Sequence, residues 1–129
     1  MSSIKHLKTE YSDGMGDIPW NEYPRPSLKR NSFLCLNGKW DLCVALDGEE
    51  VFRNEITVPF PPESALSGVN TVFDEGAALC YQRKFTIPEG FVKDRVILHF
   101  GAVDQYAAVE VNGNIIGDHV GGYEGFSFD

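Results

Sequence analysis

The residues best suited to acid–base chemistry are two adjacent acidic pairs, Glu49-Glu50 and Asp74-Glu75. Two carboxyl groups that share one reaction must face the same space. Neighbouring residues on a strand point to opposite faces, and acidic residues on a turn are solvated, so neither pair predicts a catalytic dyad. The serines lack a G-x-S-x-G elbow, and no helix follows the glycines to hold a phosphate. We therefore expect no catalytic residue in this chain taken alone.

The final segment, VEVNGNIIGDHVGGYEGFSFD over residues 109–129, collects a second set of candidate side chains. Asp118 and His119 offer hydrogen-bonding groups, and Tyr123 offers an aromatic face on which a ligand ring could stack. Glycines nearby would let the backbone approach such a ligand closely. The segment is thus a candidate contact site.

The same segment also has a structural interpretation, which we favour. Gly117, Gly121 and Gly122 supply positive φ angles or bulges, so that the chain bends at a sheet edge. Tyr123 and Phe126 would then fill the core. On this interpretation, glycines and aromatic residues serve packing.

The elements that must position these residues are strands. Apolar and polar residues alternate in most windows, and Gly, Pro and Asn-Gly or Asp-Gly pairs separate them. The expected strands span 40–46, 51–53, 55–58, 79–87, 95–100, 105–111 and 115–116, the last two joined by a turn at Asn112-Gly113. No window has helical spacing. This pattern predicts an all-β antiparallel sandwich.

Five motifs in the same order give the chain a family resemblance. They are YPRPSLKRNSFLCLNGKWDL, VPFPPES, YQRKFTIP, RVILHFGAVDQYAAVEVNG and the final segment, and together they cover about residues 23–129. In this order they closely resemble the N-terminal sugar-binding domain of family 2 glycoside hydrolases, which include β-galactosidases, β-glucuronidases and β-mannosidases. The resemblance implies a jelly roll like that of galactose-binding domains.

The resemblance also implies a non-catalytic role. The family's two catalytic glutamates lie in a downstream barrel, and its retaining mechanism needs carboxyl groups about 5–5.5 Å apart. We expect a sugar-binding or structural domain whose parent hydrolyses β-galactosides or related β-glycosides. Two alternatives stay open: a free-standing carbohydrate-binding module, and a small interaction protein that uses an open sheet edge.

In the family, one or two further strands close the jelly roll after the final segment. The resemblance therefore implies a domain over residues 33–129 that lacks its last strand or strands, with an extended arm over residues 1–32. An open edge exposes apolar side chains and unpaired backbone groups. We expect self-association through this edge, insertion of the arm into the gap, or dependence on the remainder of the parent hydrolase.

The arm contains two aromatic residues that suit surface contact. Prolines at positions 19 and 24 fix φ and disfavour regular structure, so this segment should run extended over a surface. Trp20 and Tyr23 are its candidate carbohydrate contacts. Trp40, by contrast, alternates with apolar strand positions and belongs to the core.

Composition excludes several classes of partner. The chain has 129 residues, 43% of them hydrophobic, and a net charge of −8, so it can form a packed core but repels nucleic acid and anionic membranes. No stretch suits a membrane helix or an export signal. Cys35, Cys43 and Cys80 lie among apolar neighbours, which indicates buried, reduced thiols in a cytoplasmic protein. We expect no metal site and no cofactor.

Overall fold

The computed structural model describes residues 2–3, 12–25, 27 and 30–129. In these residues every ladder is antiparallel, and the only helices are short 3₁₀ turns, which include η1 (Ser12–Gly14). The expected all-β antiparallel class is confirmed. Part of the expected arm, at positions 1, 4–11, 26 and 28–29, lies outside the described residues. The chain forms two compact units, Met1–Thr86 and Ile87–Asp129.

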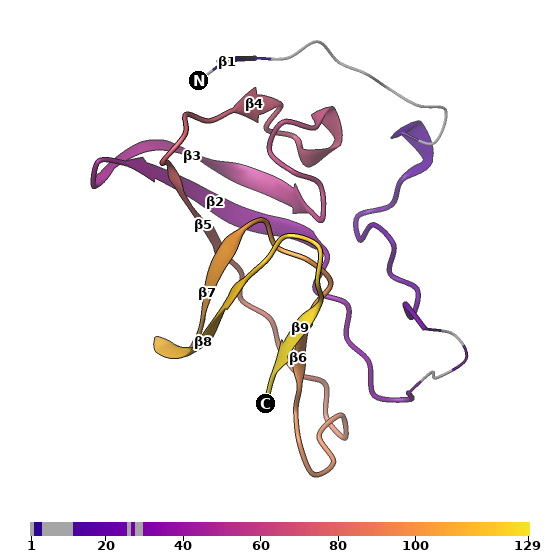
Figure 1. Cartoon of the computed structure of the whole chain (residues 1–129). Coiled ribbons are helices and arrows are strands. Elements are labelled where there is room, and N and C mark those ends of the chain that lie inside the picture. The colour runs from indigo at the N-terminus through magenta and orange to yellow at the C-terminus, as the bar shows by residue number, and fades with distance from the viewer. Residues whose placement is uncertain (1, 4–11, 26, 28–29) are drawn as a thin grey trace. The chain divides into compact units, whose positions relative to one another are not determined.

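The first unit is built on a three-stranded sheet of order β3-β2-β5 (Figure 1). Its strands are β2 (Gly38–Leu46), β3 (Glu49–Val58) and β5 (Ala78–Gln82). Asp47 and Gly48 join β2 to β3 with φ angles of 51° and 82°, as a tight hairpin turn requires. The two short strands expected over 51–58 are therefore one continuous strand.

One face of this sheet carries the core. Leu42, Val44 and Ile56 are fully buried, because alternate residues of β2 and their partners on β3 share one face. Five half-buried side chains pack against them: Trp40, Phe52, Val69, Phe73 and Ala77. Trp40 thus packs against the core, as expected, but it is half-buried and not fully buried.

The connection after β3 is more ordered than a plain loop. It contains η3 (Ala65–Ser67) and β4 (Thr71–Val72), which pairs with β1 (Ser2–Ser3). The Ser67 hydroxyl is buried, donates to the carbonyl oxygen of Ser64 at 2.7 Å and accepts from the Val69 amide at 3.0 Å. These bonds fold the connection back so that its apolar residues reach the core.

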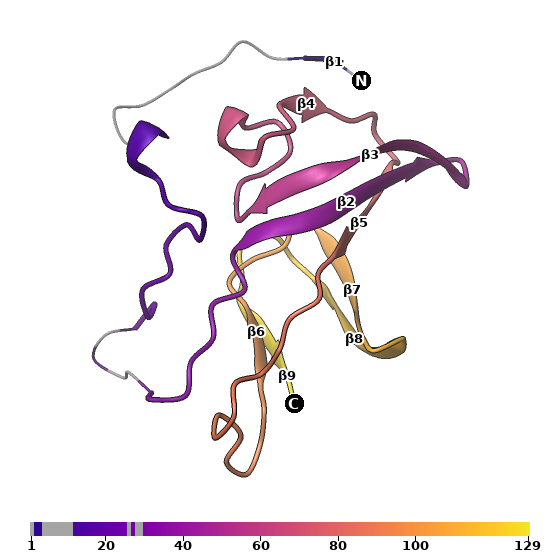
Figure 2. The same cartoon turned by 180° about the vertical axis from the view of Figure 1, so that it is seen from behind.

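The second unit consists of two strand pairs (Figure 2). They are β6 (Leu98–Phe100) with β9 (Phe126–Phe128), and β7 (Tyr106–Val111) with β8 (Asn114–Val120). Asn112 and Gly113 join β7 to β8 with φ angles of 51° and 78°. The hairpin expected at this Asn-Gly pair is confirmed.

The expected burial of the three cysteines is wrong, because none of them is fully buried. Cys80 is exposed, whereas Cys35 and Cys43 are half-buried. Cys43 alternates with Leu42 and Val44 along β2 and so lies on the face opposite the core. Cys80 is its partner on β5 and shares that face.

Candidate functional site

The turn that leads into β2 is held by three side chains. Arg83 donates from Nη1 to the carbonyl oxygens of Leu36 at 2.6 Å and Asn37 at 2.7 Å. The Trp40 indole N–H donates to the same Leu36 oxygen at 2.6 Å. The Asn37 amide donates to the carbonyl oxygen of Pro19 at 2.9 Å. We call this set the LNG clamp. It ties the arm to the central strand β2 and to the end of the edge strand β5.

Glycine is required at the centre of the clamp. Gly38 has φ +108°, and a Cβ there would lie 2.9 Å from the carbonyl oxygen of Asp17. A side chain would therefore both strain the backbone and push the arm away. The LNGKW motif thus encodes a docking point for the arm.

The clamp places Trp20 as an exposed aromatic residue. Pro19 is fully buried, whereas the neighbouring Trp20 is 64% exposed. Its ring packs against Phe60 with centroids 5.3 Å apart. Trp20 has φ +47°, a conformation that bulky residues rarely adopt without support from their surroundings. The ring therefore contacts Phe60 while most of its surface faces solvent.

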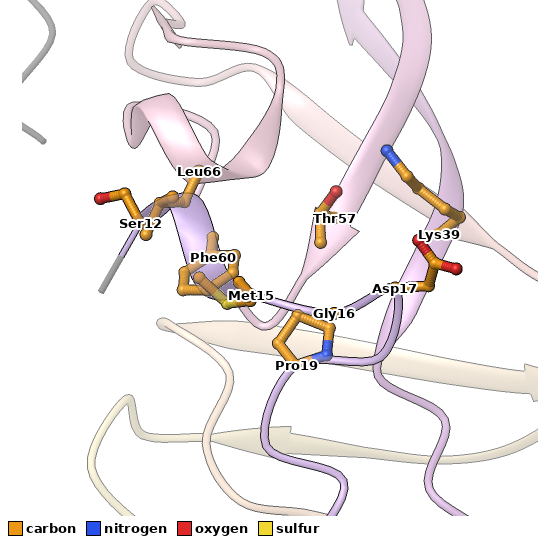
Figure 3. Close-up of a pocket in the computed structure, with 9 residues that line it drawn as sticks. All are labelled: Ser12, Met15, Gly16, Asp17, Pro19, Lys39, Thr57, Phe60 and Leu66. Carbon is orange, nitrogen blue, oxygen red and sulfur yellow. The ribbon is translucent and has the colours of Figure 1, made fainter. Parts of the chain in front are cut away.

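A small cavity of about 240 Å³ lies between the arm and the sheet, and Phe60, which the Trp20 ring contacts, is one of its lining residues (Figure 3). Met15 and Pro19 of the arm, together with Phe60, give it apolar walls, and Lys39 and Thr57 add polar groups. Its other lining residues are Ser12, Gly16, Asp17 and Leu66. The lining is part apolar and part polar, and the cavity is smaller than the roughly 300–1,000 Å³ of ordinary small-molecule sites.

Tyr23, the second candidate of the arm, is less available. It is half-buried, and its ring makes an edge contact with Phe33 at a centroid distance of 4.9 Å. Trp20 is the better exposed of the two arm residues.

The candidates of the final segment belong to the second unit and point in different directions. Asp118 and His119 are neighbours on β8, so their side chains lie on opposite faces. The His119 ring stacks on Phe126 with centroids 4.2 Å apart and an interplanar angle of 13°, and Phe126 stacks in turn on Phe100. Asp118 is exposed. His119 is therefore engaged in packing.

Tyr123 does not fill the core as expected. Its side chain is completely exposed, at 102% of the reference area. The chain around it is a bend between β8 and β9, so nothing directs the ring inward. Phe126 is half-buried within the aromatic stack, in line with its expected packing role.

The glycines of this segment have identifiable packing roles. A Cβ on Gly117 would overlap the ring of Phe128, and one on Gly122 would lie 2.5 Å from a carboxylate oxygen of Asp104. Gly121 has φ +127°. These contacts favour the structural interpretation of the Gly-rich segment over a ligand-binding one.

A bidentate ion pair lies on the outer face of the first sheet. Arg53 donates to both carboxylate oxygens of Glu50, at 2.9 and 2.6 Å, and the Cys43 thiol donates to the same carboxylate at 3.3 Å. The bonds from Arg53 and then from Cys43 lower the pKa of Glu50 from 4.5 to about 2. This carboxylate is thus a fixed anion at any ordinary pH.

The acidic pairs considered first do not form a dyad. Glu49 and Glu50 are consecutive on β3 and lie on opposite faces, and Asp74 and Glu75 are exposed beside a turn. Within the described residues, no three His, Cys, Asp or Glu side chains are grouped to hold a metal ion. In the same part of the chain, no helix is long and apolar enough to cross a membrane.

Sequence reasoning missed the role of Arg83. The sequence does contain a sign of this role, because Arg83 is a charged residue on the otherwise apolar face formed by Leu79, Tyr81 and Phe85 in the expected strand. The structure explains the interruption, since the strand ends at Gln82 and the guanidinium turns to the LNG clamp.

The described strands and their pairing define an all-β protein built of antiparallel sheets. Residues 27–129 match the family described as glycosyl hydrolases family 2, sugar binding domain. The chain belongs to this family. It is also similar to a β-galactosidase of Thermoanaerobacter pseudethanolicus (strain ATCC 33223 / 39E), with 41% identity over 49 residues. That alignment covers 38% of this chain and 7% of the relative.

Proposed function

We propose that this sugar-binding domain works as a non-catalytic structural module of a larger β-galactosidase-like hydrolase. The match over residues 27–129 carries the proposal, together with the similarity to a β-galactosidase of which the alignment covers 7%. The remainder of the hydrolase supplies the catalytic glutamates, and this domain supports the catalytic domain. We assign residues 33–129 to the jelly roll and residues 1–32 to an arm that the LNG clamp anchors.

The structural role has a direct test in calorimetry. Titration of the chain with methyl β-galactoside and methyl β-glucuronide should give no binding tighter than the millimolar range. Micromolar binding of either sugar would contradict a purely structural module and favour a free-standing carbohydrate-binding module.

Carbohydrate contact is the second candidate function, and Trp20 is the observation that favours it. Its ring is exposed and packs against Phe60, which lines the cavity of Figure 3, and an exposed aromatic face suits stacking against a sugar ring. Tyr23 is a further proposed weak contact in the first unit, and Asp118, His119 and Tyr123 are proposed as separate weak contacts in the second unit. Trp20→Ala should abolish any shift that a β-galactoside causes in NMR spectra, whereas Tyr106→Ala, at another exposed aromatic residue, should leave it unchanged.

The remainder of the parent hydrolase is the proposed partner, and the β7–β8 hairpin is proposed as a surface for self-association. Three apolar side chains of the β7–β8 hairpin support this: Tyr106, Ile115 and Val120 are 62–76% exposed. The net charge of −8 argues against nucleic acid or anionic membranes as partners. The three free thiols suit a reducing compartment such as the cytoplasm.

A further inference from the structure

Two cysteines face each other across the sheet of the first unit. Cys43 on β2 and Cys80 on β5 are direct partners in the antiparallel ladder. Directly opposed residues have Cα atoms about 4.5–5.5 Å apart, which lies inside the range of about 4.4–6.8 Å that disulfides span. Both thiols are free. The backbone therefore already has the spacing that a cross-link between these residues needs.

The surroundings of the pair differ from those of the third cysteine. Cys80 is exposed, and Cys43 is half-buried with its thiol on Glu50. The pKa of Cys43 is raised, first by that hydrogen bond, then by partial burial and the Glu50 charge, and the neighbouring Cys80 also contributes. Cys35 precedes the LNG turn and lies outside every described ladder. The two strand thiols thus form a pair that Cys35 does not join.

We propose that Cys43 and Cys80 form an oxidisable dithiol site, which closes to a cross-strand disulfide by exchange with small-molecule disulfides such as oxidised glutathione. The Cys80 thiolate, the exposed one, attacks a sulfur of the small disulfide and releases one small thiol. Cys43 then gives its proton to water and attacks the Cys80 sulfur, which releases the second small thiol. Two protein thiols are oxidised, and one small disulfide is reduced to two thiols.

Closure links the outer strand β5 to the central strand β2 directly behind Leu42 and Val44 of the core. The cross-link therefore fastens an edge of the sheet without entering the core. This inference does not depend on the proposed function, because it rests on strand register and thiol exposure alone.

Mass spectrometry tests the proposal on the intact 129-residue chain. After incubation with oxidised glutathione, acid quenching and alkylation, the chain should carry one alkyl group, on Cys35, where the reduced chain carries three, and a digest should contain the Cys43 and Cys80 peptides linked. Dithiothreitol should reverse the change, and Cys35→Ser should behave like the unmodified protein. A lasting glutathione adduct on Cys80 without the link, or a link between two chains, would overturn the proposal.

Two variants test whether closure of the disulfide requires Cys43 and Cys80 to be direct partners in the ladder, or only requires two thiols on these strands. Cys43→Ser should keep glutathione on Cys80 as a stable adduct, and the absence of that adduct would contradict Cys80 as the point of entry. In the double variant Cys80→Ser with Gln82→Cys, the new thiol faces Asp41 and lies diagonal to Cys43. Diagonal neighbours are about 7–8 Å apart between Cα atoms, beyond the range of about 4.4–6.8 Å that disulfides span, so this variant should fail to close. Closure as fast as in the unmodified protein would overturn the assignment.

Discussion

Arg83 reaches back 47 residues to donate a hydrogen bond to the carbonyl oxygen of Leu36, at 2.6 Å. That oxygen also accepts a hydrogen bond from the indole N–H of Trp40. One backbone carbonyl group therefore links Arg83, at the end of β5, to Trp40, which lies near the start of β2 and packs against the core. A fixed guanidinium with several donors is suited to hold two neighbouring carbonyl oxygens at once. The LNG clamp is accordingly the point at which the arm and the sheet meet.

Arg83→Met should destabilise the first unit by about 1–3 kcal/mol, because hydrogen bonds from a charged donor are lost and two carbonyl oxygens lose a partner. Urea unfolding followed by tryptophan fluorescence measures the effect. Lys84→Met, at the exposed neighbouring residue, should change stability by less than about 0.5 kcal/mol. If the two substitutions lower the free energy of unfolding equally, the hydrogen bonds of Arg83 in the clamp do not stabilise the first unit.

Gly117→Ala should destabilise the second unit by about 1–3 kcal/mol, because the added Cβ overlaps the Phe128 ring and forces it aside. Gly101→Ala is the matched control, since no atom lies within 4 Å of a Cβ there. Adding Phe128→Leu to Gly117→Ala should cost less than the sum of the two single changes, as expected for residues in contact. Thermal unfolding of the four variants measures this coupling, and strict additivity would contradict the packing role of Gly117.

Glu50 should titrate at about pH 2 in the folded protein, because Arg53 and Cys43 bind its carboxylate. A lowered folded-state pKa adds stability above the ordinary value of 4.5, and this stability is lost as the pH falls from there toward 2. Arg53→Gln should move the midpoint back toward 4.5 and reduce the acid-dependent loss of stability. Carbon NMR of the Glu50 carboxyl group follows the titration, and a midpoint near 4.5 in the unmodified protein would exclude the ion pair in solution.

The isolated chain should self-associate through the β7–β8 hairpin, where Tyr106 and Val120 are exposed and directly opposite each other. Val120→Lys places a charge in this patch and should shift sedimentation equilibrium toward the monomer at least tenfold. Val92→Lys, a change at an exposed valine outside the strands, should leave the equilibrium unchanged. A chain that stays monomeric at every concentration rules out this surface as a self-association site.

The sequence predicted those features whose cause is local. The Asp47-Gly48 and Asn112-Gly113 turns follow from residues that tolerate positive φ, and the burial of Leu42 and Val44 follows from strict alternation. The early end of β5 was not predictable from local pattern, because Arg83 acts through carbonyl oxygens of residues far away in the sequence.

The candidate site was predicted in part. The exposed position of Trp20 in a proline-containing arm was expected, and the structure adds its support by Phe60. The exposure of Tyr123 was not, because its aromatic type favours burial and only tertiary contacts decide where the ring lies. The facing of Cys43 and Cys80 depends on the register of two strands that alternation alone does not fix.

The most direct test of the central claim, a non-catalytic domain of a family 2 hydrolase, is a hydrolysis assay on the chain alone. The protein should be produced in a host without β-galactosidase and incubated at high concentration with nitrophenyl β-galactoside. We expect nitrophenol release equal to that of a blank from the same host. Saturable release that rises in proportion to the concentration of the chain would contradict the account.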